Sequence, residues 1–497
     1  MIQHGVDVDK TDKHGKTAFH YLCERGDVDA CVVELMIQHG ADFNKTDDAG
    51  KTAFHYLFER GKVDVSVVEL MIQHGADVNK TDGYGKTAFH HLCERGNVDA
   101  RIVDLMLQHG AGVNKTDGYG KTAFHHLCER GNVDARIVDL MLQHGADVSK
   151  TDGYGKTAFH HLCGRRNVDA RIVDLMIQHG ADVKKPDTYG STAFHHLCER
   201  GNVDARVVDL MIQHGADVNT TDRRGKTAFH NLCEKGYLDA SFVKLAIQHG
   251  ADVNKTDGFG QTAFHCLCES GNVDTCVVEL MIQHGADVNK TDHDFKTAFH
   301  YLCERFDVDV GVVKLMIQHG ADVMKTDGYG KTAFYNLCER GKVDASVVCL
   351  MIQHGADVNK TDEYGKTAFH YLCKRGDLDT NVVELMIQHG ADVKTRDRLG
   401  NTAFHYLCER RDVDVSAVEL MIQHGADVNT TNLSGETVFH NLCLGGDVDV
   451  SVVKLMIQHG VYVNKTDRYG RTAFQYLCMS QDVDPRVVEL LKDYGAY

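Results

Sequence analysis

The sequence predicts an all-α repeat solenoid, in which stacked helix-turn-helix repeats carry projecting hairpin-like turns. The string Thr-Ala-Phe-His, or a close variant of it, occurs fourteen times between Thr17 and Thr472, always at an interval of 35 residues. Each interval contains two short segments whose apolar residues have helical spacing. One such pair of helices cannot bury its own apolar faces, whereas stacked pairs can, so a linear stack is expected.

The composition is that expected when one short segment is repeated many times, and it excludes several classes of protein. The 497 residues include only two prolines and no tryptophan, and 43% of them are hydrophobic and 25% charged, which excludes a wholly disordered chain. The net charge of −17 argues against a nucleic-acid-binding protein, because such a protein would need a basic stripe. The sequence contains no run of 18 apolar residues, so no membrane-spanning helix is expected. The N-terminus shows no secretory signal.

The repeats follow one another without linkers when they are counted from the aspartate of a predicted turn. The chain starts inside a repeat, because residues 1–5 match residues 36–40, and its last repeat stops early and is expected to act as a cap. Residues 1–11 form the end of a truncated repeat. The fourteen predicted tandem repeats are 12–46, 47–81, 82–116, 117–151, 152–186, 187–221, 222–256, 257–291, 292–326, 327–361, 362–396, 397–431, 432–466 and 467–497.

In repeat 82–116 the first helix is expected at about 88–95. Thr87 precedes this apolar-periodic run and has the side chain of an N-cap, while Phe89 and Leu92 would be buried. Gly96 is expected to close the helix in a left-handed conformation. Ten repeats have glycine at this position, and the other four have Arg166, Phe306, Arg411 and Gln481.

The second helix of the repeat is expected to start after Asp99 and to end at Gly110. Aspartate fills the N-cap position in all fourteen repeats, and in the last one Pro485 follows at the first helical position, where proline fits best. Its predicted apolar face consists of Ile102, Val103, Leu105 and Met106. An extended loop and a turn over residues 117–120 then lead to the next repeat.

The repeats resemble ankyrin repeats, and matching strings cover nearly the whole chain. In repeat 82–116 the resemblance rests on DGYGKTAFH (residues 82–90), IVDL (102–105) and GA (110–111). Alanine replaces the usual proline after the threonine, and the repeat is longer than the family's common length of about 33 residues. The resemblance implies a partner-binding surface made of turn tips and inner helices, usually without catalysis.

Periodic histidines and cysteines raise the question of a metal site. His90 and Cys93 lie three residues apart on one predicted helix face, a spacing that could supply two zinc ligands. Equivalent residues of neighbouring repeats should lie roughly 8–10 Å apart, whereas zinc needs four donors at about 2.3 Å. We therefore expect no metal. His90 should bond to its own turn, as in the family, and Cys93 should be a small core residue.

The cysteines are expected to be free thiols. Thirteen of the 17 occupy the position of Cys93, which Phe58 fills in the remaining repeat, and the layer spacing exceeds the roughly 7 Å limit on the Cα separation of a disulfide. Many buried thiols suit a reducing compartment, so a cytoplasmic location is expected. The other four are Cys31, Cys266, Cys276 and Cys349.

Aromatic residues recur at the predicted turn tips, immediately before the turn glycine. A row of exposed rings is costly unless it contacts something, and tyrosine is enriched among binding hot spots. The alternative is that each ring packs on the neighbouring turn, and the sequence leaves both possibilities open. The aromatic tips are Tyr84, Tyr119, Tyr154, Tyr189, Phe259, Tyr329, Tyr364 and Tyr469.

The predicted binding surface combines these tips with Lys86, Glu94 and Arg95, which vary little between repeats. The four contiguous tyrosines from Tyr84 to Tyr189 form the longest aromatic run. Only their repeats carry a second histidine, at His91, His126, His161 and His196. Because the whole chain is acidic, an extended and partly basic protein segment is the expected ligand of this run.

The sequence thus predicts a monomeric protein-protein interaction scaffold in which other proteins are the partners. It contains no nucleophile motif, phosphate-binding loop or paired-carboxylate site, so it is predicted not to be an enzyme and to need no cofactor. Two alternatives remain open. The first is that the chain is an elastic structural spacer. The second is that it is the recognition arm of a longer enzyme or channel, since Met1 starts inside a repeat.

Repeat 292–326 departs from three local patterns at once. Phe295 replaces the turn glycine, Phe306 replaces the helix-closing glycine and Met324 replaces a loop asparagine. A bulky residue in a left-handed conformation costs about 1–2 kcal/mol, and a weak layer can uncouple its neighbours in a linear array. An early-opening segment is expected here. The alternative is that the two phenylalanines contact a partner.

Overall fold

The computed structural model describes residues 7–26, 28–60, 63–95, 98–130, 133–200, 204–236, 240–271, 273–340, 343–445, 448–479 and 483–497. These residues form 28 α-helices and no β-strand. Antiparallel pairing within them is limited to isolated bridges at the bases of the turns, such as that between Thr116 and Thr122. The predicted all-α repeat solenoid with hairpin-like turns is confirmed.

The helices fall into two compact units, Met1–Asp252 and Val253–Tyr497. The helices of the first unit are α1 (Ala18–Arg25), α2 (Ala30–Gln38), α3 (Ala53–Arg60), α4 (Val65–Gln73), α5 (Ala88–Cys93), α6 (Ala100–Gln108), α7 (Ala123–Glu129), α8 (Ala135–Gln143), α9 (Ala158–Cys163), α10 (Ala170–Gln178), α11 (Ala193–Cys198), α12 (Ala205–Gln213), α13 (Ala228–Glu234) and α14 (Ala240–Gln248).

The second unit continues the alternation of a shorter and a longer helix. Its helices are α15 (Ala263–Glu269), α16 (Thr275–Gln283), α17 (Ala298–Cys303), α18 (Val310–Gln318), α19 (Ala333–Arg340), α20 (Ala345–Gln353), α21 (Ala368–Lys374), α22 (Thr380–Gln388), α23 (Ala403–Cys408), α24 (Val415–Gln423), α25 (Val438–Leu444), α26 (Val450–Gln458), α27 (Ala473–Met479) and α28 (Pro485–Asp493).

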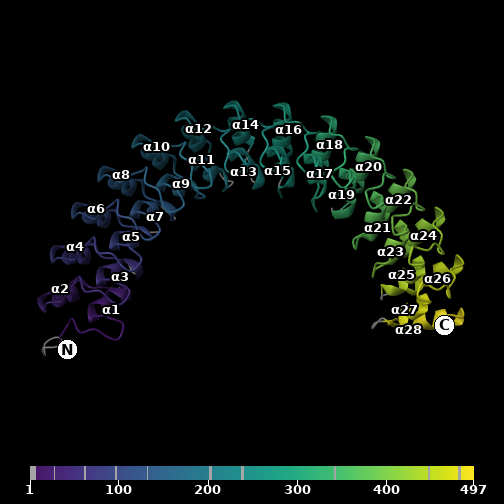
Figure 1. Cartoon of the computed structure of the whole chain (residues 1–497), viewed down its shortest axis with the longest axis horizontal. Coiled ribbons are helices and arrows are strands. Elements are labelled where there is room, and N and C mark those ends of the chain that lie inside the picture. The colour runs from purple at the N-terminus through teal and green to yellow at the C-terminus, as the bar shows by residue number, and fades with distance from the viewer. Residues whose placement is uncertain are drawn as a thin grey trace. The chain divides into compact units, whose positions relative to one another are not determined.

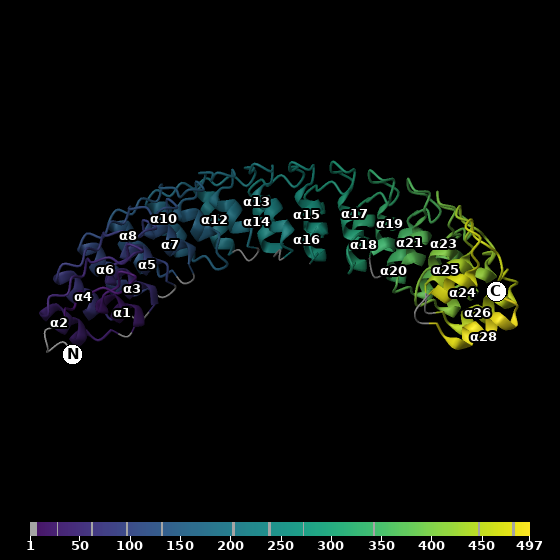
Figure 2. The ribbon, with the colours of Figure 1, turned by 60° about the horizontal axis from the view of Figure 1, so that its bottom comes forward.

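Within each unit the odd-numbered helices form one row and the even-numbered helices form another (Figure 1). Each helix contacts the next member of its own row, as α5 contacts α7 and α6 contacts α8. The loops that leave the even-numbered helices run along one edge of the layers (Figure 2), and the N-terminal ends of these helices lie at the other edge. Each unit therefore presents a row of turn tips beside its odd-numbered helices.

Both predicted N-caps are confirmed in the described helices. At α7 the backbone N–H of His125 donates to Thr122 Oγ1 at 3.4 Å, and the backbone N–H of Thr122 donates to Nδ1 of His125 at 3.1 Å. At α8 the carboxylate of Asp134 accepts from the backbone N–H of Arg136 at 2.9 Å. Pro485 opens α28 as its first residue.

The predicted helix-closing glycine holds only in part. Gly26 and Gly236 are left-handed, whereas Gly271 and Gly376 are not, because α15 and α21 end before them through the extended residues Ser270 and Arg375. α5 also ends earlier than expected, at Cys93. Gly96 and Gln481 lie outside the described residues. Arg166, Phe306 and Arg411 have no positive φ, so no strain arises there.

The core of each layer lies between the two rows of helices. Phe89, Leu92 and Cys93 of α5 are buried as predicted. In α6 the buried stripe consists of Ile102, Val103, Met106 and Leu107. Because this stripe turns away from Leu105, the side chain of Leu105 is only half-buried and the prediction for it was wrong.

Candidate interaction surface

The turn tips are held by a buried aspartate. In the turn before α7, Asp117 Oδ1 accepts from the backbone N–H groups of Tyr119 and Lys121, each at 2.9 Å. The N–H of Gly120 donates to the carbonyl of Asp117 at 3.0 Å, and Gly120 has a φ of 75°, a conformation that suits glycine. The aromatic residue is thus fixed at the outermost point of the turn.

Successive tips are joined through their backbones. The carbonyl of Tyr84 accepts from the N–H of Gly118 at 2.8 Å, that of Tyr119 from Gly153 at 2.8 Å, and that of Tyr154 from Thr188 at 3.0 Å. The same bond recurs within the second unit, where His293 donates to Phe259. We call this series of bonds the tip ladder. It connects neighbouring turns without using the aromatic rings.

The aromatic rings remain exposed along the tip ladder. The side chains of the eight predicted tip residues have between 50% and 79% of their surface exposed. In the first unit these are Tyr84, Tyr119, Tyr154 and Tyr189. In the second they are Phe259, Tyr329, Tyr364 and Tyr469, and the guanidinium of Arg471 lies 4.9 Å from the ring centre of Tyr469. Packing of the turns therefore leaves at least half of the surface of each tip residue exposed.

The second histidine of four consecutive layers lies beneath the tips and not on the surface. His126 Nε2 lies 2.8 Å from Oδ2 of Asp117, whose side chain is fully buried. His91, His161 and His196 pair in the same way with the turn aspartates Asp82, Asp152 and Asp187. In six other layers a tyrosine hydroxyl donates to this oxygen, as Tyr301 does to Asp292 at 2.6 Å. The donor thus supports the turn.

Sequence reasoning missed this support, although a signal was present. In these ten layers the donor lies nine residues after the turn aspartate, and both histidine and tyrosine can donate a hydrogen bond. Burial lowers the pKa of His91, but hydrogen bonds with Asp82 and Glu94 outweigh it and leave the pKa raised. The tips therefore rest on buried polar pairs.

The predicted charged residues largely neutralise one another. Lys86 Nζ is hydrogen-bonded to Glu94 Oε1, and the corresponding pair Lys121–Glu129 is separated by 2.7 Å. Burial opposes the charge of Glu94, but hydrogen bonds from His91 and Lys86 outweigh it and lower its pKa to about 2. Arg95 is half-buried, which lowers its pKa. Seven layers consequently offer a paired charge to a partner.

A hollow of about 550 Å³ brings part of the predicted surface together. Its lining includes the tip residues Tyr119 and Tyr154 and the charged pairs Lys86–Glu94 and Lys121–Glu129, together with His126 and Arg130. Tyr84 and Arg95 lie outside this lining, and the remaining predicted tips belong to other layers or to the second unit. The hollow joins aromatic and charged groups on the side of the odd-numbered helices.

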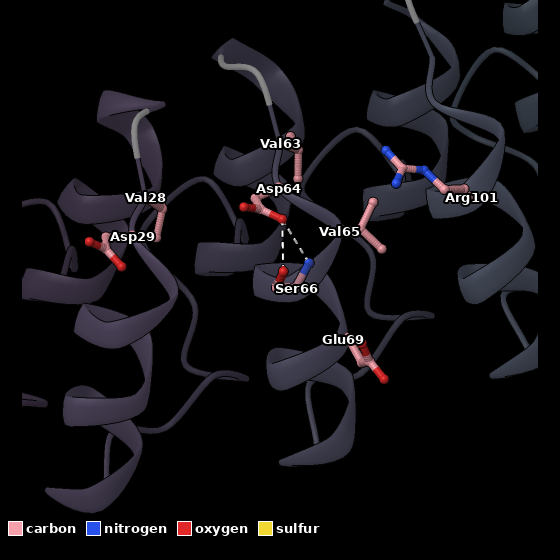
Figure 3. Close-up of a pocket in the computed structure, with 8 residues that line it drawn as sticks. All are labelled: Val28, Asp29, Val63, Asp64, Val65, Ser66, Glu69 and Arg101. Atoms are coloured by element: carbon pink, nitrogen blue, oxygen red, sulfur yellow. Dashed lines mark hydrogen bonds between the residues drawn. The ribbon is translucent and has the colours of Figure 1, made fainter.

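A second hollow, of about 790 Å³, lies at the opposite edge of the first unit (Figure 3). Asp29 and Asp64 cap α2 and α4 there. Asp64 accepts from both the backbone N–H and the hydroxyl of Ser66 at 2.9 Å, and these bonds lower its pKa. The carboxylates are engaged in capping helices, so we place the candidate surface at the turn tips.

The periodic histidine and cysteine have the predicted structural contacts. His90 Nδ1 accepts from the backbone N–H of Thr87 at 3.1 Å, its Nε2 lies 3.1 Å from the carbonyl of Lys115, and Cys93 is fully buried. Cys93 and the equivalent buried Cys128 and Cys163 are free thiols. Across the described ranges, no group of three or more histidine, cysteine, aspartate or glutamate side chains has the arrangement of a metal site.

The comparisons with known proteins concern the whole chain. A family model of ankyrin repeats (three copies) matches residues 1–82, 62–152, 134–222, 161–256, 202–292, 232–327, 275–362, 337–432 and 404–497. A search of the curated proteins found no match. Within the described residues, no helix has the length and apolar character that spanning a membrane requires.

Proposed function

The chain belongs to the ankyrin-repeat family, and from this premise we propose that it is a scaffold that binds other proteins through its turn tips and odd-numbered helices. Ankyrin repeats are generally protein-interaction modules and are typically non-catalytic. The observation that carries the proposal is the exposure of the aromatic tips. Backbone bonds already join neighbouring turns, so the rings are not needed to hold the turns together.

The proposed binding residues form two groups. The tips Tyr84, Tyr119, Tyr154, Tyr189, Phe259, Tyr329, Tyr364 and Tyr469 would provide most of the contact area, because tyrosine side chains often dominate the affinity of protein interfaces. Lys86, Glu94 and Arg95 would orient the partner, since paired charges at an interface mainly give specificity. The hollow between Tyr119 and Tyr154 supports this arrangement.

We also propose that the protein is a monomer and that it is located in a reducing, intracellular compartment. Buried free thiols at the Cys93 position support this location. The net charge of −17 favours proteins over nucleic acids as partners.

The test is a pull-down from a native extract with the full chain and with a variant in which Tyr84, Tyr119, Tyr154 and Tyr189 are changed to alanine. We expect the variant to lose proteins that the full chain retains. Each ring that is a hot spot should contribute about 1–2 kcal/mol of binding free energy. The control changes the exposed Gln108, Gln143, Gln178 and Gln213 to alanine. If both variants fold and retain the same proteins as the full chain, the tips do not bind, and a spacer role is favoured.

A further inference from the structure

One lysine beside the tips of the first unit lacks the partner that its equivalents have. In seven layers the lysine that precedes the N-cap threonine pairs with the glutamate eight residues later. These pairs are Lys16–Glu24, Lys51–Glu59, Lys86–Glu94, Lys121–Glu129, Lys226–Glu234, Lys296–Glu304 and Lys331–Glu339. In the layer of α9 and α10 the glutamate is replaced by Gly164, so Lys156 lacks the carboxylate with which its equivalents pair.

No other group in this layer takes the place of the missing glutamate. Lys366, which also lacks a glutamate, lies over the rings of Tyr371 and Tyr406 at 5.5 and 4.7 Å. In the layer of Lys156 the corresponding position is His161, which pairs with Asp152. Among the described lysines of this row, the Nζ of Lys156 alone makes neither a hydrogen bond, an ion pair nor a contact with a tyrosine ring.

The turn aspartate of this layer and the corresponding glutamates of the two adjacent layers make contacts with other residues. Asp152 is bonded to His161 and to its own turn. Glu129 of the preceding layer pairs with Lys121. Glu199 of the following layer lies 3.3 Å from His196 Nδ1, and its pKa is lowered mainly by that hydrogen bond and less by the charges of His196 and Lys156.

Several arginines occur in the layer of Lys156 and in the next two layers, although the whole chain is acidic. Arg165 and Arg166 follow Gly164, and the Nε of Arg200 donates to the carbonyl of Gly164 at 2.8 Å. The exposed Arg223 and Arg224 form the next tip after Tyr189, to which Arg223 is joined by the tip ladder. The expectation of a partly basic ligand was based on the net charge of the whole chain. The local arginines instead favour an acidic ligand for the tips near Lys156.

We propose that Lys156, between the tips Tyr154 and Tyr189, receives a carboxylate from an extended acidic segment of a partner protein. This inference rests on the proposed function. Lys156 supplies an unpaired ammonium group, and the two rings supply apolar contact for residues that flank the carboxylate. An extended segment of about eight residues reaches across about three layers. A short acidic peptide fits this local cationic stretch, whereas a long polyanion would also meet the acidic remainder of the chain.

The decisive variants are Lys156→Ala, which removes the ammonium group, and Gly164→Glu, which restores the pair found in other layers. Position 164 accepts a side chain, because its φ is −71° and a Cβ there would lie no closer than 3.4 Å to its nearest neighbour, the carbonyl of His160. Lys51→Ala is the matched control, since it removes a lysine that is already paired, with Glu59, and that lies outside the hollow between Tyr119 and Tyr154.

The probe is a fluorescein-labelled peptide of about eight residues in which glutamate alternates with serine and tyrosine, and its binding to the full chain is followed by fluorescence anisotropy. We expect each decisive variant to weaken binding by about tenfold and Lys51→Ala by less than about twofold. A twin peptide with glutamine in place of glutamate should bind as weakly as the acidic peptide binds Lys156→Ala.

Equal binding of the acidic peptide by the full chain, Lys156→Ala and Gly164→Glu would overturn the inference. So would stronger binding of a single-stranded oligonucleotide of the same charge, which would point to a nucleic-acid ligand. The proposed function fails separately, when the four-tyrosine variant retains every partner. Tyrosine-dependent partners that bind Lys156→Ala normally would leave the scaffold role standing and remove only the acidic ligand.

Discussion

At the scale of single residues, the histidine of the Thr-Ala-Phe-His string connects the helix N-cap and the loop of its own layer with the next layer. His90 accepts from the N-cap Thr87, approaches the carbonyl of Lys115 in the following loop and lies in a T-shaped contact with His126 of the next layer. Burial lowers its pKa to about 4, and the charge of His126 adds to the effect. These contacts require a neutral ring, so they make the stack sensitive to acid.

The expected consequence is a loss of stability below pH 6.5. An unfolded histidine has a pKa of about 6.5, so between pH 6.5 and 4 the unfolded chain binds more protons than the folded chain. Stability must then fall as the pH falls, by up to about 1.4 kcal/mol per pH unit for each such histidine. His55, His125 and His160 have pKa values lowered to about 4 as well.

Changing His55, His90, His125 and His160 to glutamine should therefore reduce the pH dependence of the thermal midpoint between pH 7 and 4.5, as followed by circular dichroism. Glutamine should retain the cap, because Gln475 Oε1 already accepts from the N–H of Thr472 at 3.1 Å. An equal reduction on changing the exposed His74, His109, His144 and His179 to glutamine would contradict this explanation.

At the scale of helices and turns, repeat 292–326 shows which departures from the pattern have a physical cost. Phe295 has a φ of 61° and is the one non-glycine residue with a positive φ among the described residues, so the expected strain is present there. Phe306 is exposed and unstrained. Met324 replaces an asparagine whose amide links two layers, as Asn289 does by donating to Gly320 and accepting from Asp322.

Phe295→Gly should stabilise its turn. The side chain is 62% exposed, so little burial is lost, while relief of the left-handed strain of about 1–2 kcal/mol exceeds the entropic cost of glycine, about 0.5–1 kcal/mol. The expected net gain is about 1 kcal/mol, measured as slower hydrogen exchange in residues 292–326. Unchanged or faster exchange would show that the ring makes a stabilising contact.

Met324→Asn should strengthen the link between α18 and α20. The Met324 sulfur accepts from the N–H of Asp357 at 3.3 Å, whereas Asn289 accepts the equivalent bond at 2.8 Å and also donates one. Restoring the amide should add about 1 kcal/mol. The readout is hydrogen exchange in residues 292–361, with Asn289→Met as the reciprocal variant that should destabilise. Met324→Asn should slow exchange and Asn289→Met should accelerate it, and a change in the same direction for both variants would contradict the prediction.

At the scale of the whole molecule, stability should vary along the chain. In a linear array each layer contacts only its neighbours, so a weak layer opens independently of distant ones. We expect hydrogen exchange to be faster in residues 292–326 than in residues 118–151, whose turns contain the usual glycines. Equal rates in the two segments would show that the strain at Phe295 is absorbed locally.

The constant 35-residue interval was sufficient to predict the solenoid, because the caps at Thr87 and Asp99 and the apolar stripes recur with it. The ends of the first helices were less predictable. α5 ends at Cys93, before the predicted end, and Gly26 and Gly271 show that glycines at the helix-closing position adopt different conformations from one layer to another. At the surface, the sequence indicated the exposed tips but not the burial of His91, nor the effect of Gly164 on Lys156, because both depend on contacts within a folded layer.

The tip ladder has a consequence for how such a chain can change in length. Gly118, Thr188 and Arg223 all donate the same backbone bond, so the junction between neighbouring turns is indifferent to the side chain. Residues 83–117 and 118–152 differ at only two positions. If residues 118–152 were excised, Gly153 would follow Asp117 and take the place of Gly118 against Tyr84. We expect the shortened protein to fold with one helix pair fewer and an unbroken ladder, as a proportionate loss of helical signal in circular dichroism would show. Gain or loss of whole repeats would then alter the number of tips without requiring any new junction.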